Sequence, residues 1–272
     1  MKIILLIVAS VALFACNNPT SSERAFINGV ELDFVVHGDG PALYLLHGGM
    51  ESRNSFENQI SNLAEHFTVV ALDSREQGRS GDSSSQISYA LMSQDVVALA
   101  AFLGHEQISI MGLSDGGITA ITTAIANPRL VDKLILLGAS FHYDSYPDGT
   151  REFTANYEWD GDRNPNEYPG NFIKHYLTGH DDLSKFGEKL KEMAFMWTTS
   201  PTYEQSDLFA IKAKTLIING DHEDTTLEHV LDLYDAIPNA QLFVVPDATH
   251  YALLEKPDLL NGVIMTFLND SD

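Results

Sequence analysis

The stretch ISIMGLSDGG at residues 108–117 decides the fold class. It joins an unbroken apolar run, Ile108–Met111, to the pattern G-x-S-x-G, and an apolar helical pattern follows from Gly117 to Ala126. A serine between a strand and a helix stands on a tight turn that pushes its side chain out of the sheet. The helix N-terminus beside it favours negative charge. We therefore interpret Ser114 as a nucleophile rather than as part of an ordinary turn.

Strands and helices alternate along the rest of the chain. Further unbroken apolar runs, typical of strands buried on both faces, lie at Ala42–Leu46, Thr68–Leu72, Lys133–Leu137, Thr215–Ile218 and Leu242–Val245. Amphipathic stretches separate them, at Ser55–His66, Tyr89–Leu103, Leu227–Ile237 and Tyr251–Leu268. This alternation predicts an α/β fold with a mostly parallel, doubly wound sheet. Ahead of it, Asn28-Gly29 predicts a hairpin turn between two antiparallel strands.

One segment interrupts the alternation, from about residue 141 to residue 208. It is rich in Asp, Asn, Tyr, Pro and Gly, and it becomes helical near Leu183–Trp197. Unstructured connections longer than about 15 residues are uncommon in compact domains, so the segment predicts an inserted, mainly helical cap. Five of its apolar side chains could line an acyl pocket or pack as core: Phe172, Tyr176, Phe195, Met196 and Trp197.

Length and charge restrict the class of protein. The chain has 272 residues, of which 44% are hydrophobic, and it carries 38 Asp and Glu against 16 Lys and Arg. This length fits one large domain at residues 25–272 that carries the cap insertion. The formal net charge of −22 repels phosphate backbones and argues against nucleic acid as a partner.

The N-terminus is typical of an exported bacterial protein. Met1-Lys2 supplies a positive charge, Ile3–Phe14 is apolar, and Ala15-Cys16 closes the run. The run is shorter than the roughly 20 apolar residues of a transmembrane helix. Residues 1–15 therefore predict a signal peptide.

Cys16 is the only cysteine in the chain, which excludes an intramolecular disulfide. Leu13-Phe14-Ala15-Cys16 resembles the lipobox of bacterial lipoproteins. This resemblance implies lipidation at Cys16, a polar linker at residues 16–24, and a periplasmic or cell-surface protein anchored to a membrane. The alternative is an ordinary secretory signal with an incidental cysteine.

A serine hydroxyl is a weak nucleophile until a base takes its proton. Of the ten histidines, His250 is the best placed, because it follows the last predicted strand and precedes the final predicted helix. The carboxyl ends of parallel strands meet at one edge of a sheet, where Ser114 is also expected. His47 belongs to a different loop, and His222 and His229 lie near the acidic residues discussed next.

The base needs an acid that fixes its tautomer and stabilises the imidazolium. The predicted strand Thr215–Ile218 runs into NGDHED at residues 219–224, which offers Asp221, Glu223 and Asp224. At most one of these side chains should point at His250, while the others cap the next helix or face solvent. The residues by themselves leave the choice open.

An oxyanion needs backbone N–H donors, one from the residue after the nucleophile and one from an early strand-to-helix loop. Asp115 follows Ser114, and HGGM at residues 47–50 follows the predicted strand Ala42–Leu46. Paired glycines let a backbone turn its N–H groups inward. We therefore predict Gly49 and Asp115 as donors, against the alternative of a simple turn.

Four landmarks now stand in order: LLHGG at 45–49, DSREQGRS at 73–80, the turn around Ser114, and ATH at 248–250. Together they resemble the α/β-hydrolase superfamily over about residues 25–268. The second landmark usually resembles D-x-R-G-x-G-x-S; Glu76 replaces the first glycine here, so we expect altered loop shape rather than lost activity. The acid loop usually resembles G-D-x-D, which matches Glu223, although a shift of one residue would assign Asp224.

The resemblance implies acyl transfer to water on a small-molecule ester or lactone, with Ser114 as nucleophile and His250 as base. In this superfamily a serine at the elbow argues against haloalkane dehalogenases and epoxide hydrolases, which use aspartate there. Aminopeptidases and carbon–carbon bond hydrolases share the triad, and a ligand-binding protein on the same scaffold is a further alternative. No cofactor is implied, and no metal is expected, because no H-E-x-x-H spacing occurs. The oligomeric state is left open.

Overall fold

The computed structural model describes residues 22–147, 149–156 and 172–270. Its centre is an eight-stranded sheet in the order β1-β2-β4-β3-β5-β6-β7-β8. The strands are β1 (Glu23–Ile27), β2 (Val30–His37), β3 (Ala42–Leu46), β4 (Thr68–Leu72), β5 (Ile108–Leu113), β6 (Val131–Leu137), β7 (Lys214–Gly220) and β8 (Ala240–Val245).

The sheet is mostly parallel, as the sequence predicts. Strand β2 runs antiparallel to β1 and β4, and the pairings among β3 to β8 are parallel. Asn28 and Gly29 turn the first hairpin with φ angles of 49° and 81°, which confirms the predicted turn. Strand β1 begins at Glu23, inside the segment predicted as a linker, because Glu23 and Arg24 pair with Phe34 and Asp33 of β2.

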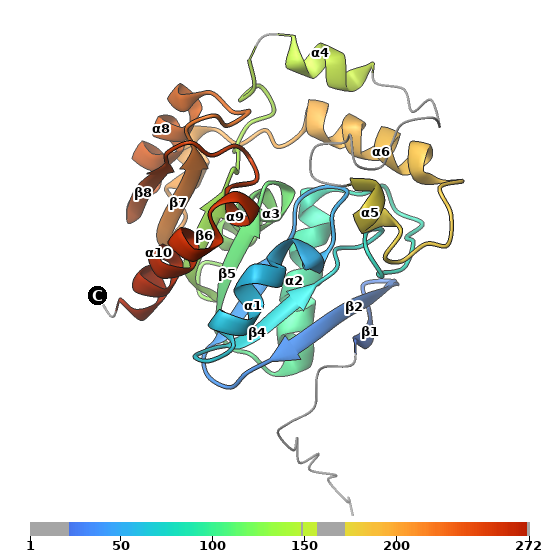
Figure 1. The fold of residues 1–272 in the computed structure, drawn as a ribbon, viewed down its shortest axis with the longest axis horizontal. Helices are drawn as coiled ribbons and strands as arrows, with labels where there is room; N and C mark the ends of the chain where they lie inside the picture. The colour runs from blue at the N-terminus through green and yellow to red at the C-terminus, as the bar shows by residue number, and fades with distance from the viewer. Residues whose placement is uncertain (1–21, 148, 157–171, 271–272) are drawn as a thin grey trace, which may run out of the picture.

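Helices cover both faces of the sheet (Figure 1). They are η1 (Arg53–Phe56), α1 (Glu57–Leu63), α2 (Tyr89–Leu103), α3 (Asp115–Ala126), α8 (Leu227–Ala236), α9 (Ala252–Glu255) and α10 (Pro257–Asn269). Leu99, Ile121 and Leu233, from α2, α3 and α8, share one buried apolar cluster. Leu63 and Leu260, from α1 and α10, belong to a second cluster on the opposite face.

Two predicted helices are each divided in the structure. The predicted helix Ser55–His66 is the 3-10 helix η1 followed by α1, and Tyr251–Leu268 is α9 followed by α10. Lys256 has a φ of −133° and a ψ of 50°, outside the helical region. Proline disfavours helical geometry in the residue before it but is well suited to the first turn of a helix, so the division falls at Pro257.

The cap contributes α4 (Thr150–Ala155), α5 (Phe172–Tyr176), α6 (Phe186–Thr199) and α7 (Gln205–Leu208); residues 148 and 157–171 of the predicted insertion lie outside the described residues. Figure 1 shows α4, α5 and α6 together at one end of the sheet. The cap packs on the core through a third apolar cluster, in which Phe186 and Leu190 join Met50 and Ile118.

The five apolar cap residues separate into three groups. Tyr176 and Met196 are buried in the cap cluster, and Phe172 and Trp197 pack partly buried against it. Phe195 points outward with 56% of its surface exposed, so it belongs to neither pocket nor core.

Within the described ranges, no helix combines the length and apolar character needed to cross a membrane. The predicted signal peptide at residues 1–15 and the predicted lipidation site at Cys16 lie outside those ranges.

Candidate active site

Ser114 lies between β5 and α3 with a φ of 53° and a ψ of −118°, a conformation that residues other than glycine rarely adopt. The turn is tight enough that only glycine fits at positions 112 and 116. A Cβ at Gly112 would lie 2.3 Å from the Gly116 oxygen, and a Cβ at Gly116 would lie 1.9 Å from the Leu46 oxygen. Ser114 is partly exposed while the residues on both sides of it are buried, so the turn presents its hydroxyl.

His250 and Glu223 come from the ends of neighbouring strands. Glu223 lies in the loop after β7, and His250 lies in the turn after β8. His250 Nδ1 is 2.5 Å from Glu223 Oε1, and the side chains are only 15% and 3% exposed. A carboxylate that accepts from Nδ1 orients the ring and leaves Nε2 to exchange protons with a nucleophile.

The Glu223 carboxylate changes the acidity of His250. Burial by itself would lower the pKa of His250, but the hydrogen bond and the charge of Glu223 outweigh burial and raise the pKa to about 9. The imidazole is therefore protonated at neutral pH. It must lose this proton before it can act as a base.

The other two candidate acids have different partners. Asp224 is exposed, and its backbone N–H donates to Glu223 Oε1 over 3.0 Å. Asp221 accepts the Ala248 N–H over 3.1 Å, and hydrogen bonds from the backbone of Asp247 and Ala248 lower its pKa. Glu223 is the acid that the structure brings to the histidine.

Glu223, Asp224 and His250 also place possible metal-ligand atoms within 4.8 Å of one another. The hydrogen bond between His250 and Glu223 already engages two of these three groups. Their arrangement therefore fits a histidine oriented by an acid, with Asp224 supporting that acid through its backbone.

Gly138 is a site residue that the sequence analysis missed. It follows β6, whose last residue, Leu137, accepts the Ser114 N–H over 2.8 Å. A Cβ on Gly138 would lie 2.8 Å from His250 Nδ1 and 2.9 Å from Glu223 Oε2. Gly138 thus lies between the turn that carries Ser114 and the hydrogen-bonded side chains of His250 and Glu223. The signal in the sequence is a glycine placed directly after a buried apolar run.

The loop after β3 is shaped by hydrogen bonds from buried side chains. His47 Nε2 accepts the Ser74 N–H over 2.9 Å, so Nδ1 carries the proton and donates to the Gly48 oxygen over 2.7 Å. Burial lowers the pKa of His47, which keeps this ring neutral. Met50, with a φ of 60°, donates its N–H to Gln77 Oε1 over 2.7 Å. His47 is thus a structural residue of this loop.

Gly49 and Asp115, the predicted oxyanion donors, lie next to each other. A Cβ at Gly49 would be 2.3 Å from Asp115 Oδ2 and 2.6 Å from Trp197 Cζ2. In the part of the chain that the structure describes, the Gly49 N–H has no hydrogen-bond acceptor. The N–H of Asp115, at the first position of α3, has none within its helix. Within the described residues, neither N–H group is therefore engaged by an acceptor in its own loop or helix.

The Asp115 carboxyl is buried beside the site, which its predicted role as an N–H donor did not indicate. It accepts hydrogen bonds from the Tyr89 hydroxyl over 2.7 Å and from Trp197 Nε1 over 2.8 Å. Burial raises the pKa of Asp115 to about 6, although both hydrogen bonds oppose the shift.

Glu51 is a second buried carboxyl that the sequence analysis missed. It accepts hydrogen bonds from Ser55 Oγ over 2.6 Å and from the Gly48 N–H over 3.3 Å. Burial raises the pKa of Glu51, while the hydrogen bond from Ser55 and the charge of His250 oppose the shift. Its side chain therefore supports the turn at Gly48 and Gly49 from inside the protein.

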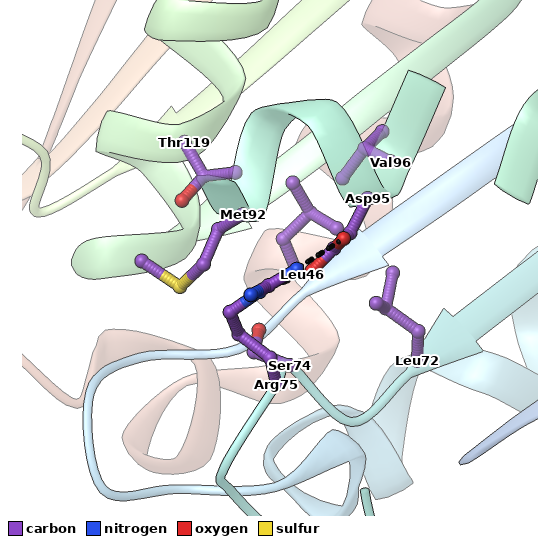
Figure 2. Close-up of a pocket in the computed structure, with 8 residues that line it drawn as sticks. All are labelled: Leu46, Leu72, Ser74, Arg75, Met92, Asp95, Val96 and Thr119. Carbon is purple, nitrogen blue, oxygen red and sulfur yellow. Dashed lines mark hydrogen bonds and ion pairs between the residues drawn. The ribbon is translucent and has the colours of Figure 1, made fainter. Parts of the chain in front are cut away.

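The segment DSREQGRS at residues 73–80 is anchored to helix α2. Arg75 binds Asp95 through two buried hydrogen bonds of 2.6 and 2.7 Å (Figure 2). The pair lines a cavity of about 10 Å³ together with Thr119, whose buried hydroxyl has no hydrogen-bond partner among the described residues. This volume fits about one water molecule and is too small for a substrate.

Glu76 adopts a backbone conformation that favours glycine. Its φ is 64°, in a region that costs a residue with a side chain roughly 1–2 kcal/mol. Its buried carboxylate accepts a hydrogen bond from Lys189 Nζ over 2.7 Å. The departure from the usual motif therefore lies in the side chain and its partner, whereas the backbone suits glycine.

Comparisons with known proteins agree with this architecture. Residues 41–168 match the family model described as alpha/beta hydrolase fold. A solved structure of a meta-cleavage product hydrolase from Pseudomonas fluorescens IP01 aligns with a TM-score of 0.78 at 20% identity. That alignment covers 92% of this chain and 98% of the other.

Two curated relatives extend the comparison. Serine hydrolase BPHL of Mus musculus is 27% identical over 266 residues, which cover 91% of this chain and 86% of that protein. A soluble epoxide hydrolase of Corynebacterium sp. strain C12 is 37% identical over 115 residues, or 42% of this chain and 40% of that protein. The chain has the α/β-hydrolase fold, as its sequence predicts. Both of these relatives are named as hydrolases.

Proposed function

We propose that the protein is a serine hydrolase that cleaves a carboxylic ester or lactone through an acyl-enzyme on Ser114. The observation that carries the proposal is the 2.5 Å hydrogen bond between His250 and Glu223, beside the Ser114 elbow. The similarity to a mouse protein named a serine hydrolase supports it. Glu223 is the proposed acid, and Gly49 and Asp115 are the proposed oxyanion donors.

The reaction proceeds in two halves. Neutral His250 takes the Ser114 proton at Nε2 as Oγ attacks the carbonyl carbon, and the Gly49 and Asp115 N–H groups bind the oxyanion. Collapse releases the alcohol, which takes the proton from His250 and leaves an acyl-serine. Water then attacks the acyl-serine with His250 again as base, and Ser114 is regenerated.

A fluorophosphonate probe and p-nitrophenyl butyrate test this proposal. The wild-type protein should be labelled once and should hydrolyse the ester, whereas Ser114→Ala should do neither. Ser84→Ala removes an exposed serine and serves as the control, with labelling and turnover unchanged. Equal labelling of Ser114→Ala and the wild type would show that Ser114 is not the nucleophile.

Three other functions are compatible with the same scaffold, and assays with a panel of different substrates distinguish them. Aminopeptidases would cleave amino-acid anilides in preference to esters, and carbon–carbon bond hydrolases would cleave β-diketone substrates. A ligand-binding protein would give at most one stoichiometric burst of p-nitrophenol. Esters and lactones of increasing acyl length, included in the same panel, would identify the preferred substrate.

We also propose that Cys16 is lipidated and that the protein is exported and held on a membrane by this anchor. The signal-like run at residues 3–14 and its closing cysteine support this proposal. Cells grown with radioactive palmitate should label the wild-type protein and not Cys16→Ser. A wild-type protein without label would contradict the proposal.

A further inference from the structure

Three polar contacts join the cap helices α5 and α6 to the loops around Ser114. They are His175 Nδ1 to Ser52 Oγ at 2.8 Å, Lys189 Nζ to Glu76 Oε2 at 2.7 Å, and Trp197 Nε1 to Asp115 Oδ2 at 2.8 Å. Each core partner belongs to a segment that shapes the candidate site. These segments are the loop after β3 that holds Gly49 (the oxyanion loop), the loop at residues 73–81 between β4 and α2 (the 73–81 loop), and the turn around Ser114. The cap therefore contacts all three.

The contact between Lys189 and Glu76 is the charged one. The two side chains are only 15% and 4% exposed, so water screens the pair weakly. Burial lowers the pKa of Lys189, but the hydrogen bond and charge of Glu76 raise it more, so the amine stays protonated. Asp82, outside α6, lies 3.3 Å from the same amine and adds a second contact between the helix and the core, whereas Glu192, 3.5 Å away, belongs to α6 itself.

The 73–81 loop connects this ion pair to the oxyanion loop. Glu76 is followed by Gln77, whose side chain accepts the Met50 N–H over 2.7 Å, directly after Gly49. The cap touches the same loop a second time, because a Cβ at Gly179 would lie 1.7 Å from the Gly78 oxygen. The 73–81 loop thus contacts the cap on one side and the loop of Gly48 and Gly49 on the other.

Trp197, near the other end of α6, contacts the oxyanion loop directly. Its ring packs against Gly49, where a Cβ would lie 2.6 Å from Trp197 Cζ2, and its N–H binds Asp115. Lys189 and Trp197 stand eight positions apart on one helix, so a shift of α6 at Lys189 also moves the ring at Gly49.

We propose that Glu76 and Lys189 form a positioning pair that fixes α6 against the 73–81 loop and so holds Trp197 against the oxyanion loop. The pair does not touch substrate; it acts through Gly49 and Met50 in the reaction of the proposed function, on which the inference rests. Glu76 therefore has a use that a glycine at the same φ would lack.

The position of α6 is tested without any turnover. The chain has two tryptophans, so Trp159→Phe leaves Trp197 as the only indole reporter. In that background, Lys189→Met and Glu76→Gln should each increase acrylamide quenching of Trp197 and shift its emission to the red. Lys185→Met removes a charge from the same end of the helix, where Lys185 is exposed and its amine lies 3.8 Å from Asp82 Oδ2, and should leave both signals unchanged.

The effect on chemistry is measured with p-nitrophenyl butyrate, per Ser114 titrated by a fluorophosphonate, so that misfolded protein is not counted. We expect Lys189→Met and Glu76→Gln to lower kcat about tenfold with KM little changed, because a displaced oxyanion loop weakens binding only of the transition state. The double variant should lose no more than either single variant, because both remove the same contact.

Three results would overturn the inference: unchanged quenching in both variants, a rise in KM at constant kcat, or equal losses in Lys185→Met. Failure of the proposed function has a different signature, since the wild-type protein would then not react with the fluorophosphonate. The quenching measurement would still decide whether the pair holds α6.

Discussion

At the scale of single residues, the proton on His250 sets the pH at which the site can work. Its pKa is raised to about 9, so below that value most molecules carry an imidazolium that cannot take a proton from Ser114. We expect kcat/KM for p-nitrophenyl butyrate to rise about tenfold per pH unit from about pH 6 and to level off near pH 9.

Glu223→Gln is the control for this profile. It removes the carboxylate that raises the pKa of His250 most, while burial still lowers the pKa and the charges of Glu51 and Asp224 still raise it. The rising limb should therefore move to lower pH as the maximal rate falls. A wild-type profile that is already flat above pH 7 would contradict the raised pKa.

The acid is distinguished from its neighbour by paired alanine substitutions. Glu223→Ala removes the carboxylate that accepts from His250 Nδ1 and should lower kcat by about 10³–10⁴-fold. Asp224→Ala keeps the backbone N–H that donates to Glu223, so kcat should change less than about threefold. Reversed losses would assign the role to Asp224. The measurement is kcat per titrated serine.

Residues whose place follows from neighbouring sequence could be predicted, and residues placed by contacts between distant segments could not. Spacing from Gly220 favoured Glu223, but only the conformation of the loop decides which carboxylate meets His250. Gly138 is marked in the sequence only as a glycine after a buried apolar run, and its importance comes from the His250 ring, 112 positions later in the chain. The partner of Glu76 lies on a cap helix, which no local motif indicates.

At the scale of elements, apolar runs predicted each parallel strand to within a few residues, because strands buried on both faces leave a continuous signal. Helix boundaries were less accurate. The final amphipathic stretch keeps its apolar face on both sides of Pro257, so the pattern alone could not show that α9 and α10 are separate. The cap was predicted as an interruption with one helix near Leu183–Trp197, which α6 confirms, whereas α4, α5 and α7 are too short to give a clear helical pattern.

The residue directly after β6 must be glycine for the site to form. Gly138→Ala adds a Cβ at 2.8–2.9 Å from His250 and Glu223, at a φ of +52°. We expect kcat to fall about 100-fold, because a displacement near 1 Å is enough to misplace the base. Gly104→Ala is the matched control, with a φ of +77° and nothing within 4 Å. Both variants should lose roughly 1 kcal/mol of stability from the strained φ, and only Gly138→Ala should lose activity.

At the scale of the whole molecule, buried ion pairs and surface charge have opposite effects on the stability of the folded state. Arg53 pairs with Asp33 and Asp73, and Arg75 pairs with Asp95, all with side chains at most 8% exposed. Such pairs are screened little by salt. The formal net charge of −22 instead places many like charges on the surface, where they repel one another in the folded state.

Added salt should therefore stabilise this protein. Sodium chloride at about 0.5 M screens the surface repulsion and leaves the buried pairs intact, so we expect a gain of about 1 kcal/mol and a Tm higher by roughly 2–4 °C. The same titration near the isoelectric point of about 4.6 is the control, because the net repulsion is absent there and the gain should vanish. A Tm that falls with salt at neutral pH would instead show that exposed ion pairs, rather than repulsion, dominate the electrostatic free energy of this fold.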